Sequence, residues 1–399
     1  MAEQAYYFNP WDPDFRADPY PHYPALLAGP PRVTILPGAP FALVARYRDA
    51  GEVLRDHAHF SSVAPPPPPD QYQGPFADSR NVLGSDPPDH SRLRRLVSRD
   101  FTPRRVRELE PRIGEIAREL VDKAAARGEF EVMSDLANIL PVMVISEMLG
   151  VPAEKYAMFK NWSDRIIAAG TALPGAPPPA ESIEALEALA EYFGREIERR
   201  RHDPGADLVS ALVAAHDDSE ALTAGELLSF VSLLLIAGNE TTTNLIGNGT
   251  LALMRNPAQL EMLRREPAML PRAIEEMLRY DGPVQSTARF PKSAIELAGV
   301  EIPAGAIVVV VIAAANRDPA QFSNPEQFDI TRDPNEHLAF GEGIHFCIGA
   351  PLARMEANLA FSAMLERFPR MRLRDPGAKL NYKGSYFLRG LDSLKLAIE

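Results

Sequence analysis

The chain has 399 residues, of which 46% are apolar, so it can bury a large hydrophobic core. Its formal net charge of −12 argues against nucleic-acid binding as the main activity. A single cysteine excludes an internal disulfide framework and is typical of a reducing cytoplasm. The first fifteen residues hold no apolar run, so we expect neither a signal peptide nor a membrane anchor, and a cytoplasmic protein.

The predicted elements begin and end with strands and are helical in between. Segments 32–36 and 41–45 are expected to form a small hairpin, and helical periodicity dominates from about residue 88 to residue 280. Segment 307–312 and the last fifteen residues again indicate strands. With no internal repeat, the pattern predicts a mainly α fold with small β-sheets in its N- and C-terminal parts, and one domain over 1–399.

Two proline-rich segments interrupt this pattern. Residues 61–84 include five consecutive prolines, which favour an extended and stiff chain, and residues 170–180 hold four prolines with two glycines. We expect both to be large surface loops that act as lids or binding loops. Plain surface insertions are the alternative.

The longest predicted helix runs from about residue 223 to residue 254, roughly 48 Å. Thr223 and Glu226 have the spacing of a capping box, and the apolar centre of the helix, residues 233–236, should be buried. A polar run, residues 237–244 (AGNETTTN), follows at the same depth, which is locally unfavourable. Broken local rules of this kind indicate function more often than accident.

The only cysteine, Cys347, lies within residues 340–349 (FGEGIHFCIG). Three glycines around it allow a loop whose backbone can approach a planar ligand closely, and a thiolate ligand on a haem iron favours cleavage of an O–O bond. A small buried hydrophobe is the alternative for a lone cysteine. The glycine spacing does not fit a dinucleotide loop, and His345 is badly placed to activate Cys347 in a cysteine hydrolase.

This segment resembles the haem-binding loop of cytochromes P-450, and the resemblance extends over nearly the whole chain. It implies a triangular helical fold, haem b as cofactor, Cys347 as the iron ligand and Gly349 as part of the haem-binding loop. Residues 237–241 match the acid–alcohol pair of the family: Ala237 lies against the haem, Gly238 opens a kink for O2, and Glu240 and Thr241 are catalytic. Thr241 bonding to the carbonyl one turn earlier is the alternative.

Further motifs of the family concern structure and the haem propionates. Glu276 and Arg279 are three residues apart, so their side chains share one helical face. Together with Arg332 they resemble the buried structural triad of the family. His90 and Arg94 project from one helical face, and the resemblance implies that both bind the propionates together with Arg289 and His345. Solvated surface cations are the alternative. A basic patch near the cysteine would suit an acidic electron donor; its expected members are Arg92, Arg95, Arg99 and Arg354.

The resemblance also implies the lining of a substrate pocket. Its expected members are mostly apolar, and ordinary core packing is the alternative for each: Leu233, Ile236, Ala237, Val284, Ser286 and Phe387. The tip of the final hairpin and residues 72–82 should close this pocket. Such a lining suits a lipophilic substrate, namely a fatty acid, terpenoid, steroid or polyketide.

The predicted function is a haem-thiolate monooxygenase that inserts one oxygen atom from O2 into such a molecule. Electrons come from a ferredoxin or flavodoxin-like partner, and we expect a monomer that binds neither nucleic acid nor membrane. One alternative is a peroxide-driven hydroxylase, which needs no acid–alcohol pair. A second alternative is a haem-binding sensor without turnover.

Overall fold

Helices make up most of the computed structural model, which describes residues 8–10, 12–36, 39–66, 72, 74–76, 79–99, 101–169, 177–214, 222–383 and 387–399. The described helices, in chain order, are α1 (Pro13–Ala17), α2 (Tyr23–Leu27), α3 (Tyr47–Arg55), α4 (Asp89–Ser98), α5 (Pro103–Arg127), α6 (Leu140–Met148), α7 (Tyr156–Ala168), α8 (Ala180–His202), α9 (Leu208–Ala214), α10 (Ala224–Arg255), α11 (Pro257–Arg265), α12 (Leu270–Asp281), α13 (Ile312–Ala315) and α14 (Ala350–Arg367). Single turns occur at η1 (Tyr20–His22), η3 (Ala153–Lys155), η6 (Pro267–Met269) and η7 (Gly343–His345), and a π-helical turn, η2, at Met133–Ala137.

The strands form small sheets near the two ends of the chain, as expected. The largest sheet has the order β1-β2-β8-β5-β3, a second has the order β4-β10-β9, and β6 pairs with β7. Their bounds are β1 (Arg32–Leu36), β2 (Ala39–Val44), β3 (Phe60–Ser61), β4 (Phe130–Glu131), β5 (Thr287–Pro291), β6 (Ile295–Leu297), β7 (Val300–Ile302), β8 (Ile307–Val310), β9 (Met371–Leu373) and β10 (Lys395–Ile398).

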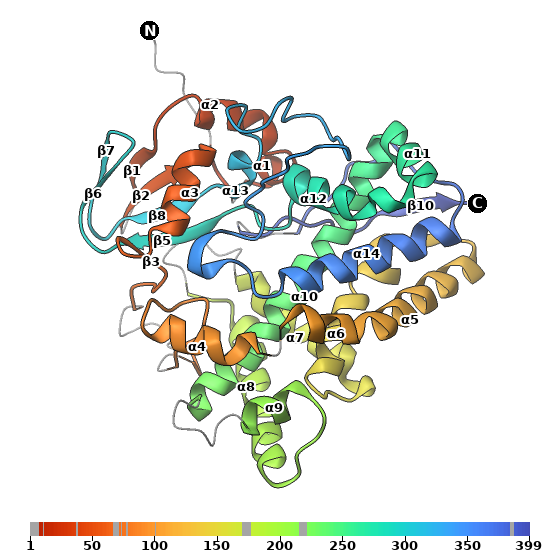
Figure 1. The fold of residues 1–399 in the computed structure, drawn as a ribbon, viewed down its shortest axis with the longest axis horizontal. Coiled ribbons are helices and arrows are strands. Elements are labelled where there is room, and N and C mark those ends of the chain that lie inside the picture. The colour runs from red at the N-terminus through yellow and green to blue at the C-terminus, as the bar shows by residue number, and fades with distance from the viewer. Residues whose placement is uncertain are drawn as a thin grey trace.

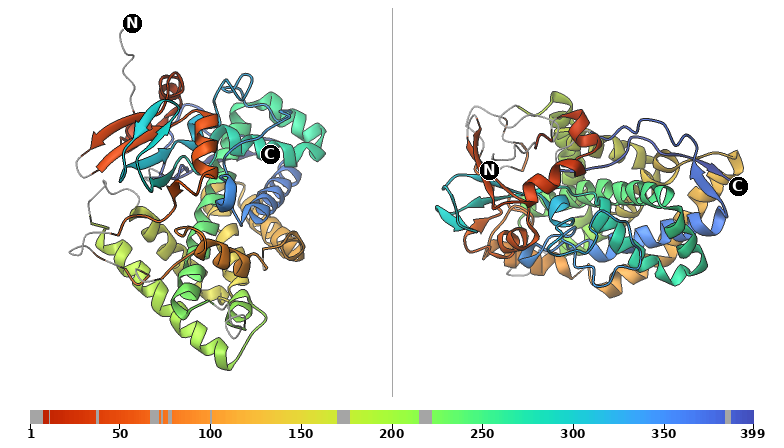
Figure 2. Two further views of the ribbon diagram at one scale, coloured as in Figure 1. Left: turned by 60° about the vertical axis from the view of Figure 1, so that its left-hand side comes forward. Right: turned by 90° about the horizontal axis from the view of Figure 1, so that it is seen from above.

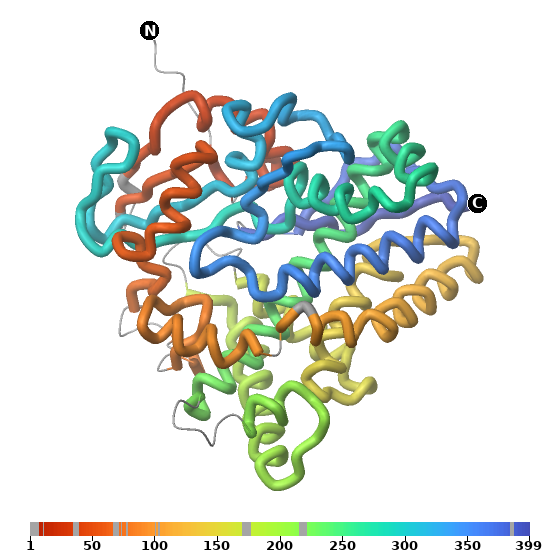
Figure 3. Tube along the Cα trace, in the orientation of Figure 1, coloured from red at the N-terminus to blue at the C-terminus, as the bar shows by residue number. Residues whose placement is uncertain are grey.

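These sheets lie at the margins of the helical part. The five-stranded sheet lies on one side of the helices, and the outline tapers toward α8 and α9, which gives the molecule a roughly triangular shape (Figures 1 and 2). The C-terminal strand β10 returns to pair with β4, more than 260 residues earlier in the chain, as the tube in Figure 3 shows. The fold therefore brings the C-terminal strand back to the segment that follows α5.

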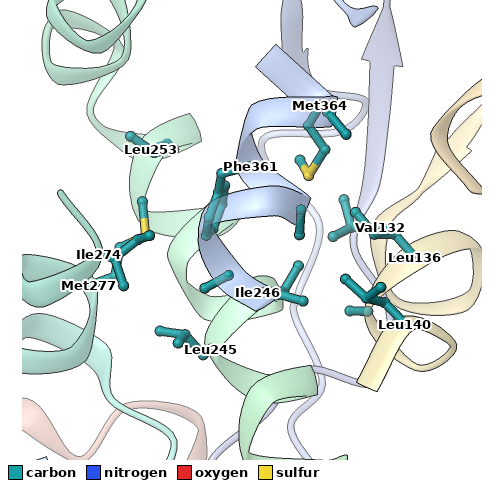
Figure 4. Close-up of a cluster of buried hydrophobic side chains, with 14 of the residues drawn as sticks. Val132, Leu136, Leu140, Leu245, Ile246, Leu253, Ile274, Met277, Phe361 and Met364 are labelled. Atoms are coloured by element: carbon teal, nitrogen blue, oxygen red, sulfur yellow. The ribbon is translucent and has the colours of Figure 1, made fainter. Parts of the chain in front are cut away.

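The long helix α10 passes through this centre. Its N-terminus is a capping box, in which the Thr223 hydroxyl accepts from the Glu226 backbone N–H at 3.1 Å and the Glu226 carboxylate accepts from the Thr223 N–H at 2.8 Å. The helix packs against α6, α7, α8, α12 and α14. Figure 4 shows the largest hydrophobic cluster, where Ile246 of α10, Met277 of α12 and Phe361 of α14 meet.

Most of the predicted elements are confirmed. The hairpin occurs as β1 and β2, and the helical region runs from α4 to α12, interrupted by the two-residue strand β4. Strand β8 ends at Val310, two residues earlier than expected, because the chain turns into α13 from Ile312 onward. Of the two proline-rich segments, residues 67–71, 73, 77–78 and 170–176 lie outside the described residues. No helix in the described part of the chain is long and apolar enough to cross a membrane.

Candidate active site

The loop that carries Cys347 is held by backbone contacts that require glycine. Gly341 and Gly343 both have a φ of 70°, a region that L side chains rarely adopt. A Cβ on Gly343 would also lie 2.9 Å from the Leu54 carbonyl oxygen at the end of α3. The Cys347 N–H donates to the Phe340 carbonyl at 2.9 Å, which closes the loop. The glycines thus allow the turn that places the thiol.

The Cys347 thiol lies at the N-terminus of α14 and is only partly buried. Burial raises the pKa of the Cys347 thiol, whereas the backbone N–H groups of Gly349 and Ala350 and the positive charge of Arg94 act to lower it. Donors at a helix N-terminus stabilise an anionic ligand. The net shift of the pKa is upward, so the same donors would stabilise the thiolate only once a cation binds the sulfur.

One face of α10 is accessible although the rest of the central helix is buried. Ala237 is exposed, and Leu233, Ile236, Gly238 and Thr241 are partly exposed, whereas nearly all other residues between 227 and 253 are buried. Spacings of three, four and eight residues from Leu233 place Ile236, Ala237 and Thr241 with it on one side of the helix. Leu233 and Ile236 border the same hydrophobic cluster as Ile348 of the cysteine loop. The accessible face and the thiol therefore belong to one region.

The acid and the alcohol of α10 have different surroundings. The Thr241 hydroxyl donates to the Ala237 carbonyl oxygen at 2.7 Å, so the bond one turn back is present. The helix is continuous from Ala224 to Arg255, and Gly238 approaches Ile145 of α6 without a break in the helix. Glu240 is almost fully buried, and its Oε1 accepts from Lys383 Nζ at 3.2 Å.

Four basic side chains from three separate segments gather beside the thiol. The rings of His90 (α4) and His345 lie 4.2 Å apart, and Arg94 and Cys347 are close enough to shift each other's pKa. Burial, together with the charges of His90 and Arg289, lowers the pKa of His345 to about 4. Burial likewise lowers the pKa of His90, Arg94 and Arg289. Within the described residues, these groups repel one another.

This cluster has the properties of an anion site. In the described part of the chain, neither Arg94 nor Arg289 has a carboxylate within ion-pair distance, and the buried Nε2 of His90 has no hydrogen-bond partner. The nearest acid, Asp86, already accepts from Ser61 and Ser62 and pairs with Lys292 at 3.2 Å. Buried cations without counter-ions are costly. The residues present therefore fit a haem, with its propionates on this cluster and its iron on Cys347.

A buried ion-pair network fixes the chain segment before the cysteine loop. Both nitrogens of the Arg279 fork donate to the Glu276 carboxylate at 2.8 Å, and Arg332 Nε donates to the same carboxylate at 3.1 Å. Glu276 and Arg279 are fully buried. Arg279 also donates to three backbone carbonyls, those of Asn316, Pro325 and Gln327. The structure thus brings together the three residues that were expected to act structurally.

The expected basic patch is smaller than the sequence suggested. Arg92 is paired with Glu226, and Arg354 holds Glu275 through two bonds of 2.7 Å. Burial alone would raise the pKa of Glu275, but the bonds from Arg354 and His337 lower it to about 2. Arg95 and Arg99 are exposed. The prediction did not account for the acidic partners, which lie far from both arginines in sequence.

The expected substrate-pocket residues outside α10 fall into two groups. Val284 bridges to Leu388, and the neighbouring Gln285 N–H donates to the Phe387 carbonyl at 2.8 Å, so these residues form one short two-stranded contact. Ser286 is buried and lines a small cavity beneath the N-terminal segment, together with Tyr23. Of the expected tip of the final hairpin, residues 386–388, residue 386 lies outside the described residues.

Sequence reasoning missed the partners that come from distant segments. Lys383 reaches Glu240 across 143 residues, and Ser62 lies 3.0 Å from His345 Nε2 across 283 residues. Asn138 accepts from Lys383 at 3.5 Å. None of these residues belongs to a motif, so no local signal could have identified them.

A lone thiol on a helix N-terminus, an accessible face on the central helix and an uncompensated basic cluster define a haem-thiolate protein. A sequence model of the family described as "Cytochrome P450" matches residues 32–168 and 180–388. The chain belongs to the cytochrome P450 family, and it is an oxidoreductase of the monooxygenase kind.

Three relatives show how close this similarity is. The chain is 46% identical over 389 residues to "Cytochrome P450 monooxygenase PikC" of Streptomyces venezuelae, covering 96% of this chain and 92% of the relative. It is 42% identical to "6-deoxyerythronolide B hydroxylase" of Saccharopolyspora erythraea, covering 80% and 78%. The solved structure of "Bacillaene Polyketide Synthase (PKS) Cytochrome P450 PksS" of Bacillus subtilis 168 superposes with a TM-score of 0.90 at 35% identity, covering 98% and 100%.

Proposed function

We propose that the whole chain acts as one haem b domain that hydroxylates a lipophilic small molecule with O2, and that the substrate is a polyketide. The partly buried Cys347 thiol, held at the start of α14 beside the accessible face of α10, is the observation that carries the proposal. The similar solved structure of PksS bears a title that refers to a polyketide synthase, which favours this class among lipophilic substrates. Electrons would come singly from a ferredoxin or flavodoxin-like donor.

In this proposal the residues of the chain divide the work. Cys347 holds the iron, and His90, Arg94, Arg289 and His345 bind the propionates. A thiolate-bound haem supplies the reductive activation of O2. The chain has to orient the substrate and deliver protons. The apolar side chains of Leu233 and Ile236 would contact the substrate and exclude water from it, and Val284, Ser286 and Phe387 would complete the wall.

The substrate class can be tested by spectral titration. We expect a macrolactone polyketide to shift the ferric Soret band of the purified protein to shorter wavelength at micromolar concentration, because a lipophilic ligand displaces water from the distal side. A fatty acid, a steroid and a terpenoid serve as comparisons. A shift with one of these and none with polyketides would reject the polyketide class. A protein that takes up no haem would reject the function itself.

The Thr241 hydroxyl can act in proton delivery because one hydroxyl both donates and accepts. Its hydrogen is directed to the Ala237 carbonyl, which leaves its lone pairs able to accept from water. We expect Thr241→Ala to bind substrate normally but to form several-fold less product per O2 consumed, with hydrogen peroxide in its place. Thr241→Ser is the matched control, because it keeps the hydroxyl and should stay coupled.

A purely helical role for Thr241 makes a different prediction. If the hydroxyl only bonds the carbonyl one turn back, alanine is the better helix former and the ratio of product to O2 should not change. Equal coupling in the alanine and serine variants would therefore refute proton delivery by Thr241. Product formed with peroxide alone at the rate seen with O2 would instead favour a peroxide-driven hydroxylase.

A further inference from the structure

The two carboxylate oxygens of Glu240 have unequal surroundings. Oε1 accepts from Lys383 Nζ at 3.2 Å. Oε2 is buried and has no hydrogen-bond partner among the described residues; the Lys160 ammonium lies 3.9 Å from it. A buried carboxylate oxygen without a donor is costly unless water or a substrate group completes it. The structure therefore marks Oε2 as the oxygen that remains open for a further partner.

The two lysines differ in how firmly they are committed to Glu240. Lys160 on α7 is paired with Asp164 of its own helix, so only part of its charge acts on Glu240. Lys383 has no other carboxylate among the described residues, and its ammonium is steadied by Asn138 Oδ1 at 3.5 Å. Lys383 is consequently the principal counter-ion of Glu240.

The backbone around Lys383 is paired with a neighbouring segment. The Lys383 N–H donates to the Gly390 carbonyl at 2.8 Å, and the neighbouring Tyr382 bridges to Leu391. Asn138 follows directly after the π-helical turn η2, which packs against α10. The backbone of Lys383 is thus held by the C-terminal segment, and its ammonium lies between Glu240 and Asn138.

We propose that Lys383 is a positioning residue for proton delivery: it binds Oε1 of Glu240 and fixes the orientation of the carboxylate, so that Oε2 stays available to the water that supplies Thr241. This rests on the proposed function. Without the ammonium, the buried carboxylate would be left with Lys160 as its counter-ion, which is already shared with Asp164. The carboxylate would also lose the bond that sets its orientation.

The stoichiometry makes proton delivery measurable. Hydroxylation follows RH + O2 + 2 e⁻ + 2 H⁺ → ROH + H2O, whereas the unproductive route follows O2 + 2 e⁻ + 2 H⁺ → H2O2. Both routes consume the same electrons, protons and O2. At one fixed concentration of the electron donor, their ratio therefore compares how the variants deliver protons.

The test compares three lysine variants in the haem-loaded protein with a surrogate ferredoxin system. We expect Lys383→Met to form several-fold less product per O2 and to show a larger solvent isotope effect on turnover, while Lys383→Arg restores most of the coupling. Lys379→Met is the matched control. Lys379 lies on the same segment, but its side chain is exposed, and its ion pair at 3.7 Å is with Asp14 rather than Glu240. In a Glu240→Gln background, Lys383→Met should cause no further loss.

A second readout does not depend on turnover. Infrared difference spectra against Glu240→Gln identify the Glu240 carboxylate band in the resting protein, and this band should shift in Lys383→Met but not in Lys379→Met. Unchanged coupling and an unchanged band in Lys383→Met would overturn the role of Lys383, and so would equal losses in the two methionine variants. Absence of product in the wild-type protein would count against the proposed function instead.

Discussion

Replacement of Cys347 by serine should abolish monooxygenase turnover while leaving the fold in place. The partly buried side chain belongs to a loop whose shape depends on Gly341, Gly343 and the bond from the Cys347 N–H to Phe340, and serine preserves all of these. A hydroxyl cannot replace a thiolate as an electron-rich axial ligand. Loss of an outer partner of a metal ligand typically costs about 10- to 100-fold, so loss of the ligand itself should cost at least about 100-fold in turnover.

The absorption spectrum of the reduced carbon monoxide complex provides the first measurement. The wild-type protein should show the long-wavelength band of a thiolate-bound haem, and Cys347→Ser should lack it. Ile348→Val is the matched control, because this neighbour of Cys347 only packs against apolar residues and should keep both the band and the turnover. A serine variant that retained the band would remove Cys347 from the site.

Thiol counting gives an independent check because the chain has one cysteine. A thiol reagent should react with one group per molecule in protein prepared without haem and with none in haem-loaded protein, since the ligand sulfur is then covered and bonded. Equal reactivity in both preparations would contradict ligation by Cys347, whatever the activity measurements show.

The parts of the site that could be predicted are those encoded within one short segment. The glycines near Cys347 predict positive φ angles. Thr223 and Glu226 predict the start of a helix, and the spacing of Glu276 and Arg279 predicts that they share one helical face. In each case the spacing along the chain determines the spacing in space, because helix and turn geometry are local. The third member of the buried triad, Arg332, came from the family resemblance rather than from spacing.

The rest of the site depends on contacts that no local pattern encodes. Glu240 pairs with Lys383. Arg92 pairs with Glu226, and Arg354 pairs with Glu275. These pairs join segments 79 to 143 residues apart, so they exist only after the fold has formed. The sequence shows which side chains carry charge, but burial and the nearest opposite charge decide whether a cation faces solvent, a carboxylate or a haem propionate.

The burial of α10 illustrates the same limit. Its apolar centre predicts a buried helix, and Leu234 and Leu235 are indeed buried. Leu233 and Ile236 are partly exposed, although they are equally apolar. Periodicity cannot distinguish a side chain that packs against another helix from one that faces a site where a ligand would bind, because both are apolar.

The second large effect should come from Arg279. Its guanidinium is fully buried, holds Glu276 through two bonds of 2.8 Å and donates to three carbonyls between residues 316 and 327. Arg279→Ala would leave the Glu276 carboxylate buried with Arg332 as its remaining cation, and the Asn316, Pro325 and Gln327 carbonyls would lose the bonds from Arg279. Breaking a buried pair from one side typically costs about 3–5 kcal/mol. We therefore expect the free energy of unfolding to fall by about that amount.

Denaturant unfolding of the haem-loaded protein measures this loss of stability. The rate of haem transfer to a haem-scavenging protein measures whether the substitution also loosens the cysteine loop. Arg265→Ala is the matched control: Arg265 makes a 2.9 Å pair with Glu261, but both side chains are more than half exposed, so the change should stay within about 0.5 kcal/mol.

If Arg279→Ala is not obtained in soluble form, Arg279→Lys tests the same contact, because lysine keeps the charge but cannot span both Glu276 oxygens and the carbonyls. The lysine variant should fall between wild type and alanine in stability and should lose haem faster than Arg265→Ala. A lysine variant as stable as the Arg265 control would show that charge alone is sufficient, and that the fork geometry does not hold the segment that leads to Cys347.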